Sequence, residues 1–261
     1  MKPYYDLGEG YPIVMLHSFN HSKLMWEYHI PSFLRAGYRV IAPDLRGHGD
    51  NRLDGREMSI ELFADDIINL LEELEVEKAS FIGSSAGGYV ALEIWKKKHS
   101  VISSLVLAGS KAQKDSQEII KRRKNQIDTL LNHGFSTYLE NVQNRLSKDT
   151  IKNRPWVLDL VKCMSANMER DAIIGALEAL INKPDHTDIL STIDVPTLII
   201  CGEEDIFTPC EYSTYLHEHI PNSELLILKD AAHINPLDQP EKFCQVVLDF
   251  LRKNGATSHN I

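Results

Sequence analysis

The chain has 261 residues, of which 43% are apolar and 25% are charged, and its formal net charge is −9 at pH 7. This composition is typical of a globular protein rather than a disordered one, and the length suits one α/β domain or a core with an inserted subdomain. The acidic charge argues against nucleic acid and against an anionic membrane surface as partners, because both attract a basic face.

The cysteines predict neither a metal site nor a disulfide framework. The four of them are scattered and form no C-x-x-C motif. We therefore expect four free thiols, which suit a reducing cytosol. Because no apolar run approaches the length of a membrane span, we predict a cytoplasmic protein without a membrane partner. The cysteines are Cys163, Cys201, Cys210 and Cys244.

The first part of the chain alternates between predicted strands and predicted helices. Short apolar runs bounded by turn residues indicate strands, and apolar side chains at helical spacing indicate helices. This alternation is typical of βαβ units, which build a parallel sheet with helices on both faces. The predicted strands are 11–16, 39–42, 79–82 and 103–108, and the predicted helices are 24–34, 59–74 and 89–98.

The alternation stops after Gly109, and 111–183 is charged and helical in pattern. It then resumes, so we interpret this segment as an insertion rather than a second fold. Its basic run, 121–124, is interpreted as an exposed helix face rather than a phosphate site. The predicted helices of the insertion are 116–131, 135–145, 155–164 and 170–180; after it come strands 195–201 and 224–228 and helices 209–219 and 240–252.

The stretch Gly83-Ser84-Ser85-Ala86-Gly87 joins a predicted strand to a predicted helix. It has the G-x-S-x-G pattern of a nucleophile elbow in its strand–turn–helix context. Small residues beside the serine suit such a sharp turn. Ser85 is the predicted nucleophile because only it has glycine two residues away on both sides; Ser84 is the alternative. An ordinary Gly/Ser-rich loop is the competing interpretation of the motif alone.

Two further polar residues follow predicted strands, as Ser85 does. Asp205 comes after strand 195–201, and His233 comes after strand 224–228. Loops that follow parallel strands gather at one edge of the sheet, and the order Ser, Asp, His is the one expected with this elbow. His233 is the candidate base for Ser85, and Asp205 would orient its ring. Glu203 or Glu204 could replace Asp205.

A tetrahedral oxyanion also needs hydrogen-bond donors. The expected donors are the backbone N–H of Ala86, which follows the nucleophile, and that of Phe19 in the loop after the first strand. His17 precedes this loop, and we predict that it fixes the loop by hydrogen bonds rather than taking part in catalysis.

With these residues in place, the chain resembles the α/β-hydrolase fold superfamily over nearly its whole length. The resemblance implies an eight-stranded, mostly parallel sheet with a helical cap inserted after the sixth strand, so that 1–110 and 191–261 form the core and 111–190 the cap. The usual first strand is expected to be missing or truncated, since little chain precedes Tyr4. The motifs are 16–19, 44–49, 83–88, 196–205 and 232–233.

The common family pattern has His-Gly where this chain has His17-Ser18, so Ser18 can offer an extra hydroxyl to the oxyanion loop. His17-Ser18 followed by the pair Met25-Trp26 is a pattern that resembles 3-oxoadipate enol-lactonase-like hydrolases. The resemblance implies a serine hydrolase of a small carboxylic ester or lactone. A C–C bond hydrolase with the same three residues, or a slow-turnover ligand receptor, is the alternative.

The remaining expectations concern the substrate and the partners. No metal, nucleotide or flavin cofactor is expected, because the sequence has no clustered ligand set and no G-x-G-x-x-G after a strand. A monomer or homodimer is expected. No Arg or Lys is evidently committed to an acidic substrate. The candidate substrate-binding residues are Ser18, Met25, Trp156, Met164 and Ile234.

Overall fold

The structure, a computed structural model, describes residues 2–53, 55 and 57–256. Its centre is a seven-stranded sheet in the order β1-β3-β2-β4-β5-β6-β7. The edge strand β1 pairs antiparallel with β3, and all other neighbours are parallel. The strands are β1 Tyr4–Leu7, β2 Tyr11–Leu16, β3 Tyr38–Pro43, β4 Ala79–Ser84, β5 Ile102–Ala108, β6 Thr197–Gly202 and β7 Ser223–Leu228.

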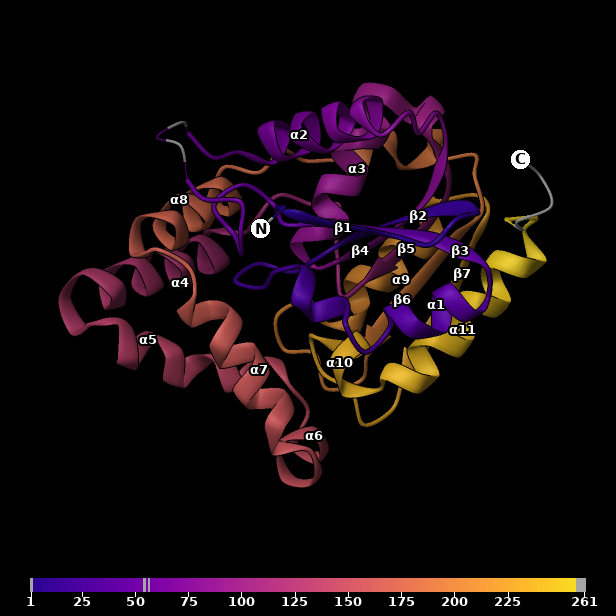
Figure 1. The fold of residues 1–261 in the computed structure, drawn as a ribbon. Helices are drawn as coiled ribbons and strands as arrows, with labels where there is room; N and C mark the ends of the chain where they lie inside the picture. The colour runs from indigo at the N-terminus through magenta and orange to yellow at the C-terminus, as the bar shows by residue number, and fades with distance from the viewer. Residues whose placement is uncertain (1, 54, 56, 257–261) are drawn as a thin grey trace.

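Helices cover both faces of this sheet, which is why its central strands are apolar without alternation. Every residue of β4 and of β6 is buried. Helices α2, α3 and α9 pack in one apolar cluster, and α1 and α11 pack in a second cluster on the opposite face (Figure 1). The elements outside the insertion are η1 Lys23–Trp26, α1 Ile30–Arg35, α2 Ile60–Glu73, α3 Ala86–Lys98, η2 His99–Val101, α9 Cys210–His219, α10 Asn235–Asp238 and α11 Pro240–Lys253.

Between β5 and β6 the chain is helical, and we call residues 111–190 the helical insert. Helices α4 to α7 lie to one side of the sheet (Figure 1). Side chains of α7 join one apolar cluster, and those of α8 join the other. The boundaries of core and cap stay a prediction. The elements are α4 Gln117–Asp128, η3 Thr129–His133, α5 Phe135–Glu140, η4 Asn141–Arg145, α6 Lys148–Asn153, α7 Pro155–Ala166, α8 Arg170–Ile181 and η5 Thr187–Thr192.

The structure corrects four expectations. The sheet of the described residues has seven strands and the insert follows the fifth, one fewer in each case than the resemblance implies, which agrees with the expected loss or truncation of the usual first strand. Strand β1 was not predicted, because it is a four-residue edge strand whose side chains are at most half-buried. The predicted helix 24–34 is divided into η1 and α1, since Pro31 suits only the first turn of a helix. Helix α6, which Ser147 caps through the Thr150 N–H, lies where the sequence predicted no helix.

The cysteines also differ from the prediction. Cys201 near the end of β6 and Cys210 at the start of α9 form a disulfide, with their Cα atoms 5.8 Å apart. The expectation of a free thiol was therefore wrong for these two, and it holds for the exposed Cys163 and the buried Cys244. The cytoplasmic location stays a prediction, and the expectation of four free thiols no longer supports it. None of the described helices is long and apolar enough to cross a membrane.

Candidate active site

Ser85 lies in the sharp turn between β4 and α3, with a φ of 50° and a ψ of −109°. A non-glycine residue in such a conformation costs about 1–3 kcal/mol, which the surrounding structure must offset. The backbone N–H of Ser85 donates to the carbonyl of Ala108 at 2.8 Å, which fixes the turn against β5. A Cβ on Gly87 would lie 2.2 Å from the carbonyl oxygen of Leu16. The turn therefore needs glycine at this position.

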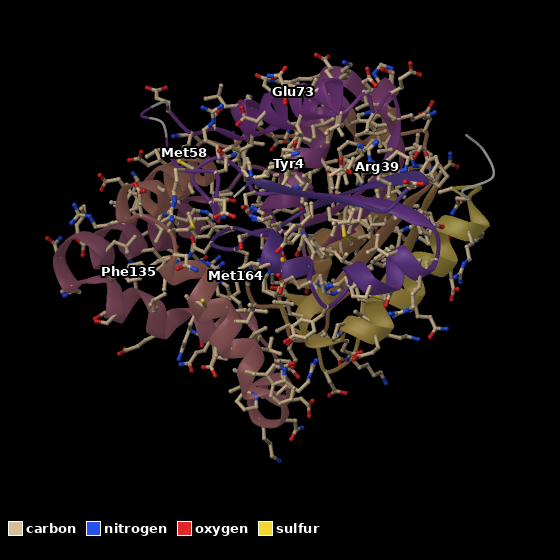
Figure 2. The ribbon with its side chains drawn as sticks, viewed as in Figure 1. Tyr4, Arg39, Met58, Glu73, Phe135 and Met164 are labelled. Carbon is tan, nitrogen blue, oxygen red and sulfur yellow. A yellow bond between two sulfur atoms is a disulfide. The ribbon has the colours of Figure 1, made fainter. Side chains whose placement is uncertain are left out.

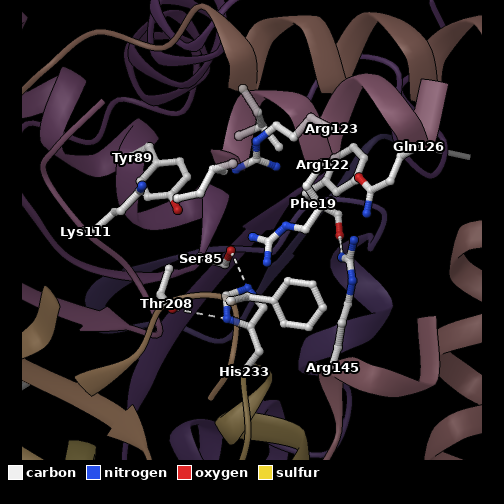
Figure 3. A pocket seen from close by; sticks show the side chains of 13 residues that line it. Phe19, Ser85, Tyr89, Lys111, Arg122, Arg123, Gln126, Arg145, Thr208 and His233 are labelled. Carbon is white, nitrogen blue, oxygen red and sulfur yellow. Dashed lines mark hydrogen bonds between the residues drawn. The ribbon is translucent and has the colours of Figure 1, made fainter. Parts of the chain in front are cut away.

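Ser85, His233 and Asp205 form a continuous line of hydrogen bonds. The hydroxyl oxygen of Ser85 lies 2.9 Å from Nε2 of His233. On the other side of the ring, Nδ1 lies 2.9 Å from Oδ2 of Asp205. Figure 3 shows Ser85 and His233 facing each other at the wall of one pocket. The structure thus brings together three residues that are up to 148 positions apart in the chain.

Asp205 is buried and held by several donors. Its Oδ1 accepts from the backbone N–H groups of Phe207 and Thr208, at 2.8 and 2.9 Å, and its Oδ2 accepts from the Thr208 hydroxyl at 2.7 Å. Burial alone would raise the pKa of Asp205, but the neighbouring His233 and these hydrogen bonds hold it below its ordinary value. Glu203 and Glu204 are both exposed to solvent. The geometry therefore favours Asp205 as the partner of His233.

The second serine of the elbow has a different environment. Ser84 is fully buried, and its hydroxyl accepts a hydrogen bond of 2.9 Å from the hydroxyl of Ser18. Ser18 therefore contacts the end of β4. The extra hydroxyl proposed for Ser18 ties the oxyanion loop to the elbow strand.

The two backbone groups expected to hold an oxyanion lie at element ends. Ala86 is the first residue of α3, where the N–H groups of a helix have no partner within the helix. Phe19 follows β2 and lines the same pocket as Ser85. Its carbonyl accepts a hydrogen bond of 2.8 Å from the guanidinium of Arg145, which comes from the helical insert. Arg145 thus fixes the peptide of the loop from the insert side.

His17 has the structural role that the sequence predicted. Its Nε2 accepts from the backbone N–H of Leu45 at 2.9 Å, so the ring proton is on Nδ1 and is donated to the carbonyl of Ser18. Burial lowers the pKa of His17, which keeps the ring neutral in this arrangement. The ring connects the loop after β2 to the loop after β3.

The pocket next to Ser85 and His233 is narrow, with a cavity volume of about 30 Å³. The candidate substrate residues lie elsewhere. Met25, Met164 and Ile234 are buried in one apolar cluster together with side chains of α1, α7 and α11. Figure 2 shows Met164 on α7. Trp156 is 52% exposed at the start of α7. Besides Ser85 and His233, the pocket is lined by Phe19, Tyr89, Lys111, Ile119, Arg122, Arg123, Gln126, Arg145, Leu180, Phe207 and Thr208.

Four cationic side chains line this pocket, and the sequence analysis had missed all of them. Figure 3 shows Arg122, Arg123, Arg145 and Lys111 around Ser85 and His233. The expectation that the run 121–124 forms an exposed face is correct for Lys121 and Lys124 and wrong for the two arginines between them. A signal was present: Ile119, Arg122, Arg123 and Gln126 have the spacing of one helix face.

One buried carboxylate, that of Asp115, compensates part of this charge. It pairs with Arg123 at 2.6 Å and with Lys111 at 2.9 Å, and Lys183 lies 3.8 Å away. Burial would raise the pKa of Asp115, but these cations hold it below its ordinary value. Burial lowers the pKa of Lys183 to about 7. Among the residues that the structure describes, no group of three His, Cys, Asp or Glu is arranged to hold a metal ion.

With this geometry in hand, we compared the chain with known proteins. A family model described as "alpha/beta hydrolase fold" matches residues 11–240. 3-Oxoadipate enol-lactonase 1 of Acinetobacter baylyi is 27% identical, with 92% of this chain and 88% of that protein covered. The 2-hydroxy-6-oxononadienedioate/2-hydroxy-6-oxononatrienedioate hydrolase of Burkholderia vietnamiensis is 27% identical, with coverage of 96% and 90%. A thermophilic esterase of Thermogutta terrifontis, solved with malate bound, is 30% identical and superposes with a TM-score of 0.90, covering 96% of this chain and 93% of that one.

Proposed function

The chain is an enzyme of the α/β-hydrolase fold family, and we propose that it hydrolyses a carboxylic ester or lactone through an acyl-enzyme on Ser85. The observation that carries this proposal is the hydrogen-bonded line from Ser85 through His233 to Asp205 at the wall of a narrow pocket. A serine hydroxyl is a poor nucleophile unless an adjacent base removes its proton during attack. The names of an esterase and an enol-lactonase among similar proteins support the same class of substrate.

In the first half of the reaction, the Ser85 oxygen attacks the carbonyl carbon while its proton passes to Nε2 of His233. The backbone N–H groups of Phe19 and Ala86 stabilise the negative charge that develops on the carbonyl oxygen. When the tetrahedral intermediate collapses, the bond to the leaving oxygen breaks and His233 returns the proton to that oxygen. For a simple ester an alcohol departs, whereas for a lactone the new hydroxyl stays attached to the acyl group.

In the second half, His233 takes a proton from a water molecule, whose oxygen attacks the acyl-enzyme. Collapse of the second intermediate releases the carboxylic acid and returns the proton to Ser85. Asp205 keeps the Nδ1 proton of His233 in place and stabilises the imidazolium that forms in each half. Two backbone N–H groups and the Thr208 hydroxyl fix this carboxylate, so it does not have to reorient during the reaction.

Hydrolysis of p-nitrophenyl butyrate tests the proposal. We expect repeated turnover by the wild type and a loss of roughly three orders of magnitude or more in Ser85→Ala, because the nucleophile is removed. Ser84→Ala is the matched control, because it removes the neighbouring hydroxyl and leaves that of Ser85 in place. It should keep repeated turnover, with a loss limited to that of the hydrogen bond from Ser18. Equal activity of wild type and Ser85→Ala would exclude the serine mechanism, and a single turnover without further reaction would favour the ligand receptor.

A C–C bond hydrolase is the second candidate, because the Burkholderia vietnamiensis relative is named as a hydrolase of 2-hydroxy-6-oxononadienedioate. The same three residues can serve both reactions. Loss of the absorbance of a vinylogous diketone, compared with ester turnover by the same preparation, distinguishes them. A higher kcat/KM for the diketone would replace our first proposal.

A further inference from the structure

We propose that the substrate carries a carboxylate besides its ester or lactone group, and that Arg122 and Arg145 bind this carboxylate at the insert side of the pocket. The inference rests on the proposed hydrolase function and adds the substrate class to it. It depends on the cations that remain without a carboxylate partner, on their position relative to His233, and on the pathway into the pocket.

Arg145 is a buried cation without a counterion. It is 7% exposed and forms no ion pair within the described ranges, and its guanidinium donates a hydrogen bond to the Phe19 carbonyl through one of its nitrogens. A guanidinium has five N–H donors. Burying one without a carboxylate is costly unless a ligand supplies the charge. The remaining donors of Arg145 are thus available to an anion in the pocket that it lines.

Arg122 is the second cation without a carboxylate. No ion pair or hydrogen bond of its side chain is found among residues 2–53, 55 and 57–256, and its guanidinium lies 5.0 Å from the centre of the Phe207 ring. Glu118, one turn earlier on α4, is exposed and does not pair with it. Within the part of the chain that the structure describes, the guanidinium of Arg122 is therefore held by an aromatic face, a contact that is weaker than a bidentate pair with a carboxylate.

The neighbouring charges leave the pocket positive. Arg123, Lys111 and Lys183 share the single carboxylate of Asp115. Four cations line the pocket, and the carboxylates of Asp115 and Asp205 offset two of these charges, which leaves the pocket positive. Neutralising such a pocket requires an anionic ligand, whereas a neutral ester would leave the repulsion among the cations in place.

The Phe207 ring limits the distance between the substrate carboxylate and the bond that reacts. The Phe207 ring centre lies 5.9 Å from the Arg145 guanidinium, 5.0 Å from that of Arg122 and 5.2 Å from the His233 ring. Both guanidinium groups and the His233 ring thus lie within about 6 Å of one ring centre, which limits how far a carboxylate held by the arginines can be from the base. This favours a short acyl chain with a terminal carboxylate, such as a half-ester of a small dicarboxylic acid or a lactone that bears one.

Arg122 and Phe207 also control access to the pocket. The pair lines the narrow pocket and, together with the 64% exposed Ile206, lines two hollows on the surface beside α4. An entering carboxylate would meet Arg122 first and draw its guanidinium from the Phe207 face. This movement enlarges a cavity that is otherwise too small for an acyl group.

The test compares monoethyl succinate with ethyl butyrate, whose acyl chains have equal length, by measuring released ethanol. We expect the wild type to prefer the anionic ester by roughly tenfold or more in kcat/KM, and Arg122→Gln to lose most of this preference through a higher KM. The matched control is Lys121→Gln, which removes one exposed charge from the same helix and should keep the preference. Equal values for both esters in the wild type would overturn the subsite.

A binding measurement separates this inference from the proposed chemistry. Calorimetry on Ser85→Ala should show binding of monoethyl succinate that weakens with added NaCl and is lost in Ser85→Ala/Arg122→Gln, with weaker or no binding of ethyl butyrate. If the anion binds in this way but neither ester is hydrolysed by the wild type, the subsite stands and the hydrolase proposal fails. If the two esters bind equally, or neither binds, the subsite is wrong whatever the turnover.

Discussion

The two walls of the pocket differ in how completely their polar groups are paired. On the sheet side, Ser85, His233 and Asp205 satisfy one another, and backbone N–H groups of the 205–208 loop complete the set. On the insert side, neither Arg122 nor Arg145 has a carboxylate partner within the described residues. Arg122 lies against the Phe207 ring, and Arg145 donates to the Phe19 carbonyl and lies against aromatic faces. A wall whose groups are already paired is arranged for a reaction, whereas a wall with unpaired charges is arranged for a ligand.

The backbone differs between the walls in the same way. The elbow is held by glycines whose neighbours are backbone atoms, so it has a single arrangement. The insert side is built from side chains on α4 and η4, which can change with little effect on the sheet. We infer that the chemistry belongs to the sheet edge and the choice of substrate to the insert. The predictions below test that division, from the largest expected effect to the smallest.

The largest effect is expected for Asp205→Asn. An amide at this position would stabilise the wrong tautomer of His233, so kcat for ethyl butyrate should fall by roughly 10³–10⁴ with little change in KM. Glu204→Gln is the matched control, because that carboxylate is exposed in the same loop. A loss in the control that equals the loss in Asp205→Asn would reassign the acid.

The next effect concerns the backbone of the elbow. Gly87→Ala should lower the free energy of unfolding by about 3 kcal/mol or more and abolish activity, because its Cβ would collide with the backbone of β2. Gly175→Ala in α8 should cost little, since the three atoms nearest its Cβ all belong to the flexible side chain of Met58. Urea unfolding of both variants measures the contrast. If Gly175→Ala proved the more damaging of the two, the rigidity would belong to the insert.

Arg145→Gln should reduce kcat for the neutral ester by about tenfold, because the Phe19 carbonyl loses a buried charged donor and the loop loses its anchor. Arg170→Gln, which removes an exposed arginine of α8, is the control. Steady-state kinetics with ethyl butyrate separates this positioning effect from the binding of an anion. An unchanged kcat in Arg145→Gln would show that the insert does not act on the loop.

The smallest effect is a pH dependence of stability. The pKa of Lys183 is lowered to about 7 in the folded state, whereas its ordinary value is about 10.4. Between these values the unfolded state holds more protons, so this group makes the free energy of unfolding rise with pH, by at most about 1.4 kcal/mol per pH unit. Urea titrations from pH 7 to 9.5 should show a flatter profile for Lys183→Met than for wild type or the exposed control Lys124→Met. Parallel profiles would mean that Lys183 stays charged.

Local sequence signals were sufficient for the parts of the molecule that the backbone determines. Helix α2 agrees within a residue at each end with the predicted helix 59–74, and Ser59 is its N-cap. Strand β2 has the predicted bounds. The elbow and the residues after β6 and β7 could be found because parallel strands direct their following loops to one edge.

The insert-side residues could not be found in this way. That Arg145 lies beside Phe19, and that α4 turns Arg122 rather than Lys121 toward Ser85, depends on how the insert packs against the core. The Cys201–Cys210 pair was missed for a related reason. The strand end and the helix start come within disulfide range only after the turn between them has folded.

The central claim is that an acyl group is transferred to Ser85. Rapid acid quenching of the enzyme during turnover of p-nitrophenyl butyrate, followed by digestion and mass spectrometry, measures it directly. We predict that the butyryl group is found on the peptide that contains Ser85, and that fragmentation assigns it to this residue rather than to Ser84. In a His233→Ala variant that has been acylated by a more reactive ester, the acyl group should persist, because the base that activates water for deacylation is missing. Turnover without any acylated peptide, or an acyl group on Ser84, would contradict the account.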